Sequence, residues 1–536
     1  MVARRVAWLL AAWLCATPAF AQVETWQNTE YTNFVGGLND TSDSTVVKDN
    51  EATDLQNVVF TTSGAFTKRP FFAPLTTSDA ATCGGSAATG LAFYKQADGD
   101  RFLVAVCAND TIQKMDYASG NSGPDGAWDA ITGSLSFDVN ANILADFAVA
   151  EDDLIIEDGL NTTAPYIFTG TGNASALSGS PPNSTMVEYH KRLLWIAGNN
   201  SNPSRVTFSN LDDITTWTST DFILVETDDG QPITGLVSGL DCLYTFKSHS
   251  IWRICGTNRD DFTLEQMVRG VGASNQQAIT VINNQFVFQT WTGDVAIYDG
   301  GLRVEILSGK IEGSLADTET TRTRLASAIA FDDGTGDEDF YLSTTLAGDS
   351  EHSRVLVFDT LHKAWTKFAG VHANALMVYE TGSIEQALGF SDYQGVVNEY
   401  PTTHANANMT DEAYYKSGQS LLGMPQQKTV HLVQVLARQE ARGHELTFEP
   451  RINFASTGIQ KTIELAGSGA VYDTAIYDVD TYADLTTTLA DIEINQTSNY
   501  FQWYIENLED QEPFLVRAVR VWAESTGRIE GDQTAP

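Results

Sequence analysis

The sequence predicts an almost entirely β-structured protein: a β-propeller-like body followed by a C-terminal β-sandwich. The apolar runs are rich in Val, Ile, Phe, Tyr, Trp and Thr, which suit half-buried strands, and no window shows a long apolar pattern at helical spacing. Short strand-like runs recur between Gly, Asp and Asn turns, and the chain contains 42 Gly. Its 536 residues exceed one ordinary domain, so we expect two or three.

The predicted propeller covers residues 81–402. Asp98-Gly99 is a typical hairpin turn between two strand-like runs. Several units close with Asp or Asn, then a turn, then Trp, as Asp359 and Trp365 do. Self-similarity at about 40–50 residues in an all-β chain is typical of propeller blades, and about six or seven units fit. The alternative is one large β-sandwich or two stacked sandwiches.

The pattern changes on both sides of this body. Residues 22–80 are expected to form an extended polar arm and the first strands. After a polar linker, residues 403–536 contain longer strands and a polar tail, and we expect a separate β-sandwich there. Phe501, Trp503 and Ile505 alternate along one of these strands, which places them on one face.

The N-terminus has the pattern of a secretory signal peptide over residues 1–21. Arg4 and Arg5 precede an apolar run, and a small-x-small triplet then predicts cleavage before Gln22. The apolar run is too short for a membrane-spanning helix, and no other segment is long and apolar enough to cross a membrane. The alternative is an apolar segment that is never processed, for example from a misplaced start codon.

The formal net charge is −38, and the acidic residues are spread along the chain. A surface that grips nucleic acid would show a basic stripe instead, so the charge argues against that class. Its plainest interpretation is solubility and self-repulsion.

Cys242 and Cys255 flank the run LYTFKSHSIWRI. If a turn lies at Lys247 to Ser250, the two cysteines oppose each other across a hairpin. This arrangement permits a disulfide, and it equally permits a pair of small buried side chains.

The chain contains no sequence motif of a known catalytic site, so we expect neither an enzyme nor a bound cofactor or metal. The sequence does not exclude a pair of carboxylates for glycoside hydrolysis, because the fold and not the sequence spacing sets the distance between such groups. One acidic turn has carboxylates that could hold Ca²⁺, but it lacks the ligand order of a calcium loop, and a solvated hairpin tip is favoured. The acids of this turn are Asp332, Asp333, Asp337, Glu338 and Asp339.

Residues 34–72 carry a more specific pattern. The segment contains Gly36-Gly37-Leu38, then Leu55-Gln56-Asn57, and then Lys68-Arg69-Pro70. It resembles the opening of the tail nozzle proteins of short-tailed bacteriophages, also called tail tubular protein B, and of related phage propeller proteins. Looser matches extend the resemblance in patches to about residue 528.

The resemblance implies a structural virion protein that is not an enzyme. Such proteins form a homo-oligomeric ring, a hexamer by this resemblance, below the portal and adaptor. They bind tail fibres or a needle, and duplex DNA passes through without specific binding during ejection. The acids expected to line that channel are Asp228 and Asp229 together with Asp332, Asp333, Asp337, Glu338 and Asp339.

A secretory signal does not suit a virion protein that assembles in the cytoplasm. The alternative is therefore an exported β-propeller binding protein of the bacterial periplasm or cell surface. A secreted glycan-active propeller enzyme is the third possibility.

Overall fold

The computed structural model describes residues 26–70, 72–75, 83–332, 336–382, 385–400, 412–439, 444–465, 487–508 and 514–526. The predicted signal peptide and Asp333 lie outside these residues. The regular structure is almost all strand, with a single turn of α-helix, α2 (Glu312–Ala316), among the described elements. No helix in the described ranges is long and apolar enough to span a membrane.

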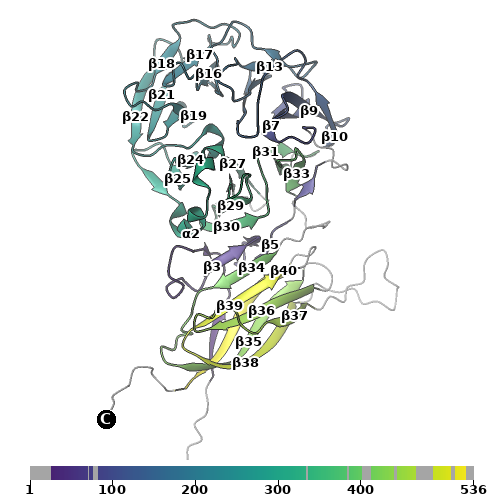
Figure 1. Ribbon diagram of the computed structural model, residues 1–536, viewed down its shortest axis with the longest axis vertical. Helices are drawn as coiled ribbons and strands as arrows, with labels where there is room; N and C mark the ends of the chain where they lie inside the picture. Colours follow the sequence, from purple (N-terminus) through teal and green to yellow (C-terminus); the bar gives the residue numbers. More distant parts are fainter. Residues whose placement is uncertain are drawn as a thin grey trace, which may run out of the picture.

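Seven four-stranded antiparallel sheets form the propeller and lie around one axis (Figure 1). The first four blades consist of β7 (Ala88–Lys95), β8 (Arg101–Cys107), β9 (Thr111–Tyr117) and β10 (Pro124–Ala130); β11 (Asp146–Ala150), β12 (Asp153–Glu157), β13 (Tyr166–Phe168) and β14 (Ser175–Ala176); β15 (Met186–His190), β16 (Leu193–Ala197), β17 (Arg205–Phe208) and β18 (Phe222–Leu224); and β19 (Ile233–Gly239), β20 (Cys242–Lys247), β21 (Ser250–Cys255) and β22 (Thr263–Arg269). The last three consist of β23 (Ile279–Ile282), β24 (Gln285–Gln289), β25 (Val295–Tyr298) and β26 (Val304–Ile306); β27 (Ser327–Phe331), β28 (Asp339–Thr344), β29 (Arg354–Asp359) and β30 (Ala364–Ala369); and β31 (Ala375–Glu380), β32 (Gln386–Ser391), β33 (Val397–Tyr400) and β6 (Ala73–Pro74).

The Asp/Asn-turn-Trp closures have a physical basis in the blades. Trp365 lies opposite Phe358 across the last hairpin of the sixth blade, and Trp128 lies opposite Met115 in the first. Trp217 instead follows a loop, where its indole Nε1 donates to the carbonyl of Ile214 at 3.0 Å. Two of the tryptophans thus pair across the outer hairpin of a blade, whereas Trp217 packs against the apolar cluster between the second and third blades.

The ring is closed by a strand from far away in the sequence. β6 supplies the outer strand of the seventh blade, where Pro74 lies opposite Asn398 and Ala73 opposite Glu399. Sequence patterns placed residues 73–74 in the N-terminal arm, because a pairing of such long range leaves no local repeat. Closure by antiparallel pairing removes the free edge that an open seventh blade would expose.

Both ends of the chain build the β-sandwich, so the propeller is inserted between them. One sheet contains β1 (Gln27–Tyr31), β4 (Val58–Phe60), β5 (Phe66–Lys68), β35 (Lys428–Gln439), β38 (Thr487–Ser498) and β40 (Phe514–Ser525). The other contains β2 (Gly37–Leu38), β3 (Glu51–Gln56), β34 (Ala413–Ser417), β36 (His444–Ile452), β37 (Lys461–Leu465) and β39 (Phe501–Asn507). The segment expected to be an arm thus supplies strands to both sheets, a partnership that only three-dimensional pairing reveals.

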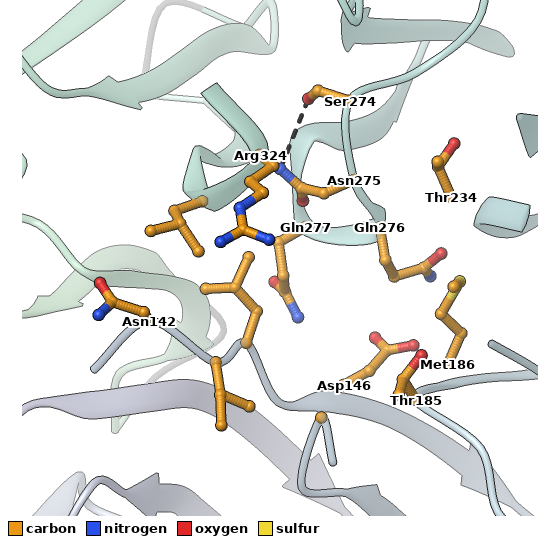
Figure 2. Close-up of a pocket in the computed structure, with 14 residues that line it drawn as sticks. Asn142, Asp146, Thr185, Met186, Thr234, Ser274, Asn275, Gln276, Gln277 and Arg324 are labelled. Carbon is orange, nitrogen blue, oxygen red and sulfur yellow. Dashed lines mark hydrogen bonds between the residues drawn. The ribbon is translucent and has the colours of Figure 1, made fainter. Parts of the chain in front are cut away.

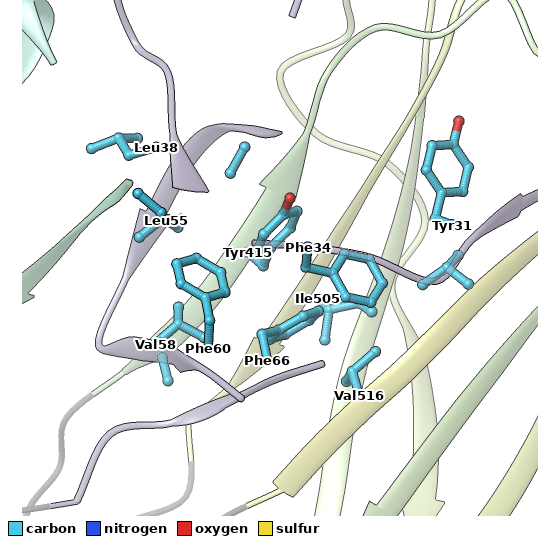
Figure 3. Packing of buried hydrophobic residues seen from close by; sticks show 14 of the residues in the cluster. Tyr31, Phe34, Leu38, Leu55, Val58, Phe60, Phe66, Tyr415, Ile505 and Val516 are labelled. Carbon is cyan, nitrogen blue, oxygen red and sulfur yellow. The ribbon is translucent and has the colours of Figure 1, made fainter. Parts of the chain in front are cut away.

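The sandwich core is aromatic (Figure 3). The alternating Phe501, Trp503 and Ile505 of β39 are all fully buried. The ring of Phe34 meets those of Phe66 and Trp503 edge-on, at centroid distances of 5.0 and 5.9 Å. Burial of each such side chain contributes roughly 2–3 kcal/mol, so these contacts fix the N-terminal strands in the sandwich.

Candidate binding site on the propeller axis

A cavity of about 310 Å³ lies at one end of the propeller, where inner strands of several blades begin. Because strands alternate in direction within each blade, the connections between blades all fall at this end. The lining comes from those connections and from the strand starts that follow them (Figure 2). The lining residues are Asn142, Ile143, Leu144, Asp146, Gly159, Thr185, Met186, Thr234, Ser274, Asn275, Gln276, Gln277, Arg324 and Leu325.

Side chains at the strand starts tie neighbouring blades together. Gln276 pairs with the backbone of Leu236: its Oε1 accepts from the amide at 2.7 Å, and its Nε2 donates to the carbonyl at 3.0 Å. Asn275 Nδ2 donates to the carbonyl of Ala326 at 3.0 Å. These amides satisfy backbone groups that blade-to-blade packing would otherwise bury unpaired, so they serve the scaffold of the cavity.

Asp146 begins β11 and faces the cavity from the second blade. Its Oδ2 accepts from the amide of Val187 in the third blade at 2.9 Å. Burial raises the pKa of Asp146 to about 7, and backbone hydrogen bonds to the carboxylate only partly oppose that rise. The group therefore carries a partial charge near neutral pH.

Two further carboxyl groups, half-buried Glu188 and fully buried Glu157, lie near Asp146. Burial, reinforced by the charge of Asp146, raises the pKa of Glu188 to about 8. The carboxyl of Glu157 is fully buried and accepts from the hydroxyl of Ser184. Burial raises the pKa of Glu157 well above its usual range. These raised pKa values leave Glu157 and Glu188 largely protonated near neutral pH, so Asp146 carries most of the negative charge close to the cavity.

Arg324 supplies the opposite charge. It belongs to the 3-10 turn η3 (Thr320–Leu325), its side chain is exposed, and Figure 2 shows it at the cavity with Asn142 and Gln277 around the same space. Within the described part of the chain its guanidinium has no hydrogen-bond or ion-pair partner. Its neighbour Arg322 donates from Nη1 to Asn142 Oδ1 at 3.0 Å. Arg324 is thus the uncommitted cation of the cavity.

A buried histidine holds the end of this turn. His352 Nε2 lies 2.9 Å from the carbonyl of Leu325, and its Nδ1 lies 2.8 Å from Thr345 Oγ1. Since a carbonyl only accepts, Nε2 carries the proton and Nδ1 accepts from the hydroxyl. Burial lowers the pKa of His352 to about 4, so the ring is neutral at ordinary pH and fixes the position of the residue next to Arg324.

The residues of the 34–72 pattern gather elsewhere, where the sandwich meets the sixth blade. Asn57, Lys68 and Arg69 are all buried. Lys68 Nζ donates to Asn507 Oδ1 at 3.2 Å inside the sandwich, and the Arg69 guanidinium lies 5.3 Å from the centre of the Phe368 ring in β30. Their burial within one chain favours a local role over contact with a neighbouring subunit.

The glycines of the pattern allow close backbone approach at the same junction. A Cβ on Gly36 would lie 2.5 Å from the carbonyl oxygen of Asn50. Gly37 has a φ of +69°, and a Cβ there would lie 2.8 Å from the backbone of Trp365. Leu38 is fully buried in the sandwich core. The carbonyl of Pro70 accepts from Arg69 Nη1 at 2.9 Å, so the whole pattern serves the junction.

The acids expected to line a channel do not come together. Asp228 and Asp229 lie in the connection between β18 and β19, at the cavity end of the propeller. The turn of Asp332, Asp337, Glu338 and Asp339 joins β27 to β28, which places it at the opposite end. Asp229 Oδ1 lies 2.8 Å from the fully buried Nζ of Lys247, and Asp339 Oδ1 accepts from the amide of Thr360 at 3.0 Å.

Four cysteines form two disulfides. Cys242 and Cys255 are bonded across the β20–β21 hairpin, whose register places Phe246 opposite Ile251 as the sequence predicts. Cys83 is bonded to Cys107, which lies 24 positions along the chain, and sequence reasoning missed this pair. The cavity residues were also missed, because the strand starts that supply them are far apart in sequence and share no motif.

No protein-family model and no curated protein sequence matches the chain. Among solved structures, the chain is similar to BBS1N in its complex with ARL6DN, with 12% identity, a TM-score of 0.39, and coverage of 62% of this chain and 98% of that one. It is also similar to BamB from Moraxella catarrhalis, with 14% identity and a TM-score of 0.36. That match covers 64% of this chain and 99% of that one. The N-terminal domain of Nup159 matches with 10% identity and a TM-score of 0.37, and the match covers 64% of this chain and 97% of that one. These likenesses are too distant to bear on function, and it is the strand pairing of this chain that identifies it as a β-propeller protein with a β-sandwich.

Proposed function

We propose that this chain is an exported β-propeller that binds a small polar ligand in the cavity at the end of its axis. The observation that carries the proposal is Arg324, an exposed cation at the cavity with no partner among the described residues. The amides of the neighbouring strand starts are committed to the scaffold, whereas Arg324 is available. A cavity of about 310 Å³ lined mostly by polar side chains suits a small polar molecule.

Export is supported by the signal-like N-terminus and by the two disulfides. Disulfides persist in oxidising compartments and are rare in the cytosol. The full chain, expressed in a bacterial host, is expected in the periplasmic fraction with a mass that begins at Gln22 and with its four remaining cysteines inaccessible to alkylation. Cytoplasmic retention with free thiols contradicts export.

The cavity is tested separately, by native mass spectrometry of the gently purified protein. We expect a small molecule to co-purify with the wild type and to be lost from Thr185→Trp, which fills the cavity. Thr227→Trp, at an exposed position, is the matched control and keeps the molecule. If both variants retain the co-purifying molecule to the same extent, the cavity is not its binding site.

A ring-forming virion subunit is the second candidate, supported by the resemblance carried by residues 34–72. The residues of that pattern meet at one junction, which suits a segment that sets the angle between propeller and sandwich. Negative-stain microscopy and sedimentation of the purified chain test it. Rings favour the virion subunit, and a monomer at all concentrations argues against it.

A further inference from the structure

We infer that the axial cavity takes a small monocarboxylic acid whose carboxylate is bound by Arg324. The inference rests on the binding function proposed above and adds the chemical class of the ligand. In a chain with a net charge of −38, Arg324 has no hydrogen-bond or ion-pair partner among the described residues, and it lies at a cavity. A guanidinium matches a carboxylate in a planar, two-pronged geometry.

Neighbouring side chains of the cavity also offer hydrogen-bonding groups beside Arg324. Asn142 uses its Oδ1 to accept from Arg322, which leaves the Nδ2 of the same amide as the group it can offer a ligand. Asp146 is the one other ionisable group among the described lining residues, and its Oδ2 is already committed to the amide of Val187. Gln277 Nε2 donates to the carbonyl of Ala145, so its Oε1 is an acceptor on this side of the cavity, and Arg324 and Asn142 supply the donors for a carboxylate.

The remaining walls favour a single negative charge on a small carbon skeleton. Ile143, Leu144, Met186 and Leu325 contribute aliphatic surface to the cavity. A phosphate dianion would meet more repulsion than a monoanion from Asp146, which lines the cavity and is partly ionised near neutral pH. A monoanion at Arg324 avoids most of that repulsion, since like charges at close range are costly in a low-dielectric site.

Isothermal titration of the full chain with matched probes tests the inference. The carboxylates are D-glucuronate and pentanoate, the neutral partners are D-glucose and pentanamide, and inorganic phosphate is the third kind of probe. We expect at least one carboxylate to bind about tenfold or more tightly than its neutral partner and than phosphate. That ratio corresponds to about 1.4 kcal/mol.

Variants locate the binding. Arg324→Gln is expected to abolish the preference for the carboxylate, and Arg324→Lys to retain part of it. Arg303→Gln, at another exposed arginine outside the cavity lining, is the control and should bind as the wild type does.

The inference is overturned if neutral partners bind as well as acids, if phosphate binds more tightly, if Arg324→Gln binds as the wild type, or if none of the probes binds. Its failure is distinct from failure of the cavity itself. A co-purifying neutral molecule that Thr185→Trp excludes would leave the binding function standing while refuting the acid.

Discussion

Asn57 Oδ1 accepts a hydrogen bond from Arg69 Nε at 2.9 Å, and the same oxygen accepts from the amide of Ala369 in the sixth blade at 3.0 Å. The Asn57 amide nitrogen donates in turn to the carbonyl of Glu412 at 2.8 Å. One buried side chain thus joins the β4–β5 region, the propeller and the strand that begins the C-terminal half of the sandwich. This connection gives Asn57 and Arg69 of the 34–72 pattern a structural role.

Replacement of Asn57 by Ala should lower the free energy of unfolding by about 3 kcal/mol, because several buried partners lose their hydrogen bonds at once. Asn57 also has a φ of +54°, which Ala adopts at some cost. Asn284→Ala is the control, since Asn284 has a φ of +61° but an exposed side chain. Chemical denaturation measures both variants, and equal losses would assign the whole effect to backbone strain.

Asp229→Asn should destabilise the fourth blade far more than Asp228→Asn. The Lys247 ammonium is fully buried and lies 2.8 Å from Asp229, whereas the Asp228 side chain is exposed. Removal of the one carboxylate leaves a buried charge without its counter-ion, at a cost of about 3 kcal/mol. Thermal unfolding of the two variants measures the difference. Similar behaviour would mean that Asp229 is as dispensable as its exposed neighbour.

Loss of either disulfide should lower the free energy of unfolding by about 3 kcal/mol, since the bonds close loops of 24 and 13 residues in the unfolded chain. The Cys83→Ser/Cys107→Ser and Cys242→Ser/Cys255→Ser double variants test each bond alone. Reductant should lower the melting temperature of the wild type and leave a quadruple variant unchanged. A wild type insensitive to reductant, with free thiols by mass, would contradict the bonds.

Stability should fall as the pH rises above about 6.5. Asp146 and Glu188 have pKa values of about 7 and about 8 in the folded protein, well above the unfolded values of 3.8 and 4.5. The native state therefore holds more protons than the unfolded state across that interval, and it loses this advantage as the pH rises through the folded pKa values. His352 has a pKa of about 4 in the folded protein, below its usual value of about 6.5, so below about pH 6.5 it makes stability rise with pH.

Denaturation between about pH 6.5 and 9 measures the carboxyl contribution, which is on the order of 1 kcal/mol for Asp146 and 2 kcal/mol for Glu188. Asp146→Asn and Glu188→Gln should each flatten the slope and be more stable than the wild type at the alkaline end. Glu151→Gln, at an exposed position, should keep the wild-type slope. Other carboxyl groups with raised pKa values, Glu157 among them, leave a residual slope, so the assignment is refuted if either variant keeps the full wild-type slope.

Much of the fold follows from local sequence. Alternation of apolar and polar residues marks strands, and Asp98-Gly99 marks a hairpin whose Gly99 has a φ of +101°. The repeated turn-Trp closure indicates blades, and the alternating Phe501, Trp503 and Ile505 indicate the buried face of β39. Each of these signals lies within one hairpin or one strand, where neighbours in sequence are also neighbours in space.

Tertiary structure alone decided the rest. Pairing of Pro74 with Asn398 closes the ring, and insertion of Phe34 into the aromatic core makes the first strands part of the sandwich. The cavity joins Asp146 and Arg324 from different blades, 178 positions apart by their residue numbers (324 − 146). Such contacts depend on the closure of the whole propeller, so no short window of sequence contains both partners. Local periodicity therefore determines the strands, and long-range pairing determines the site.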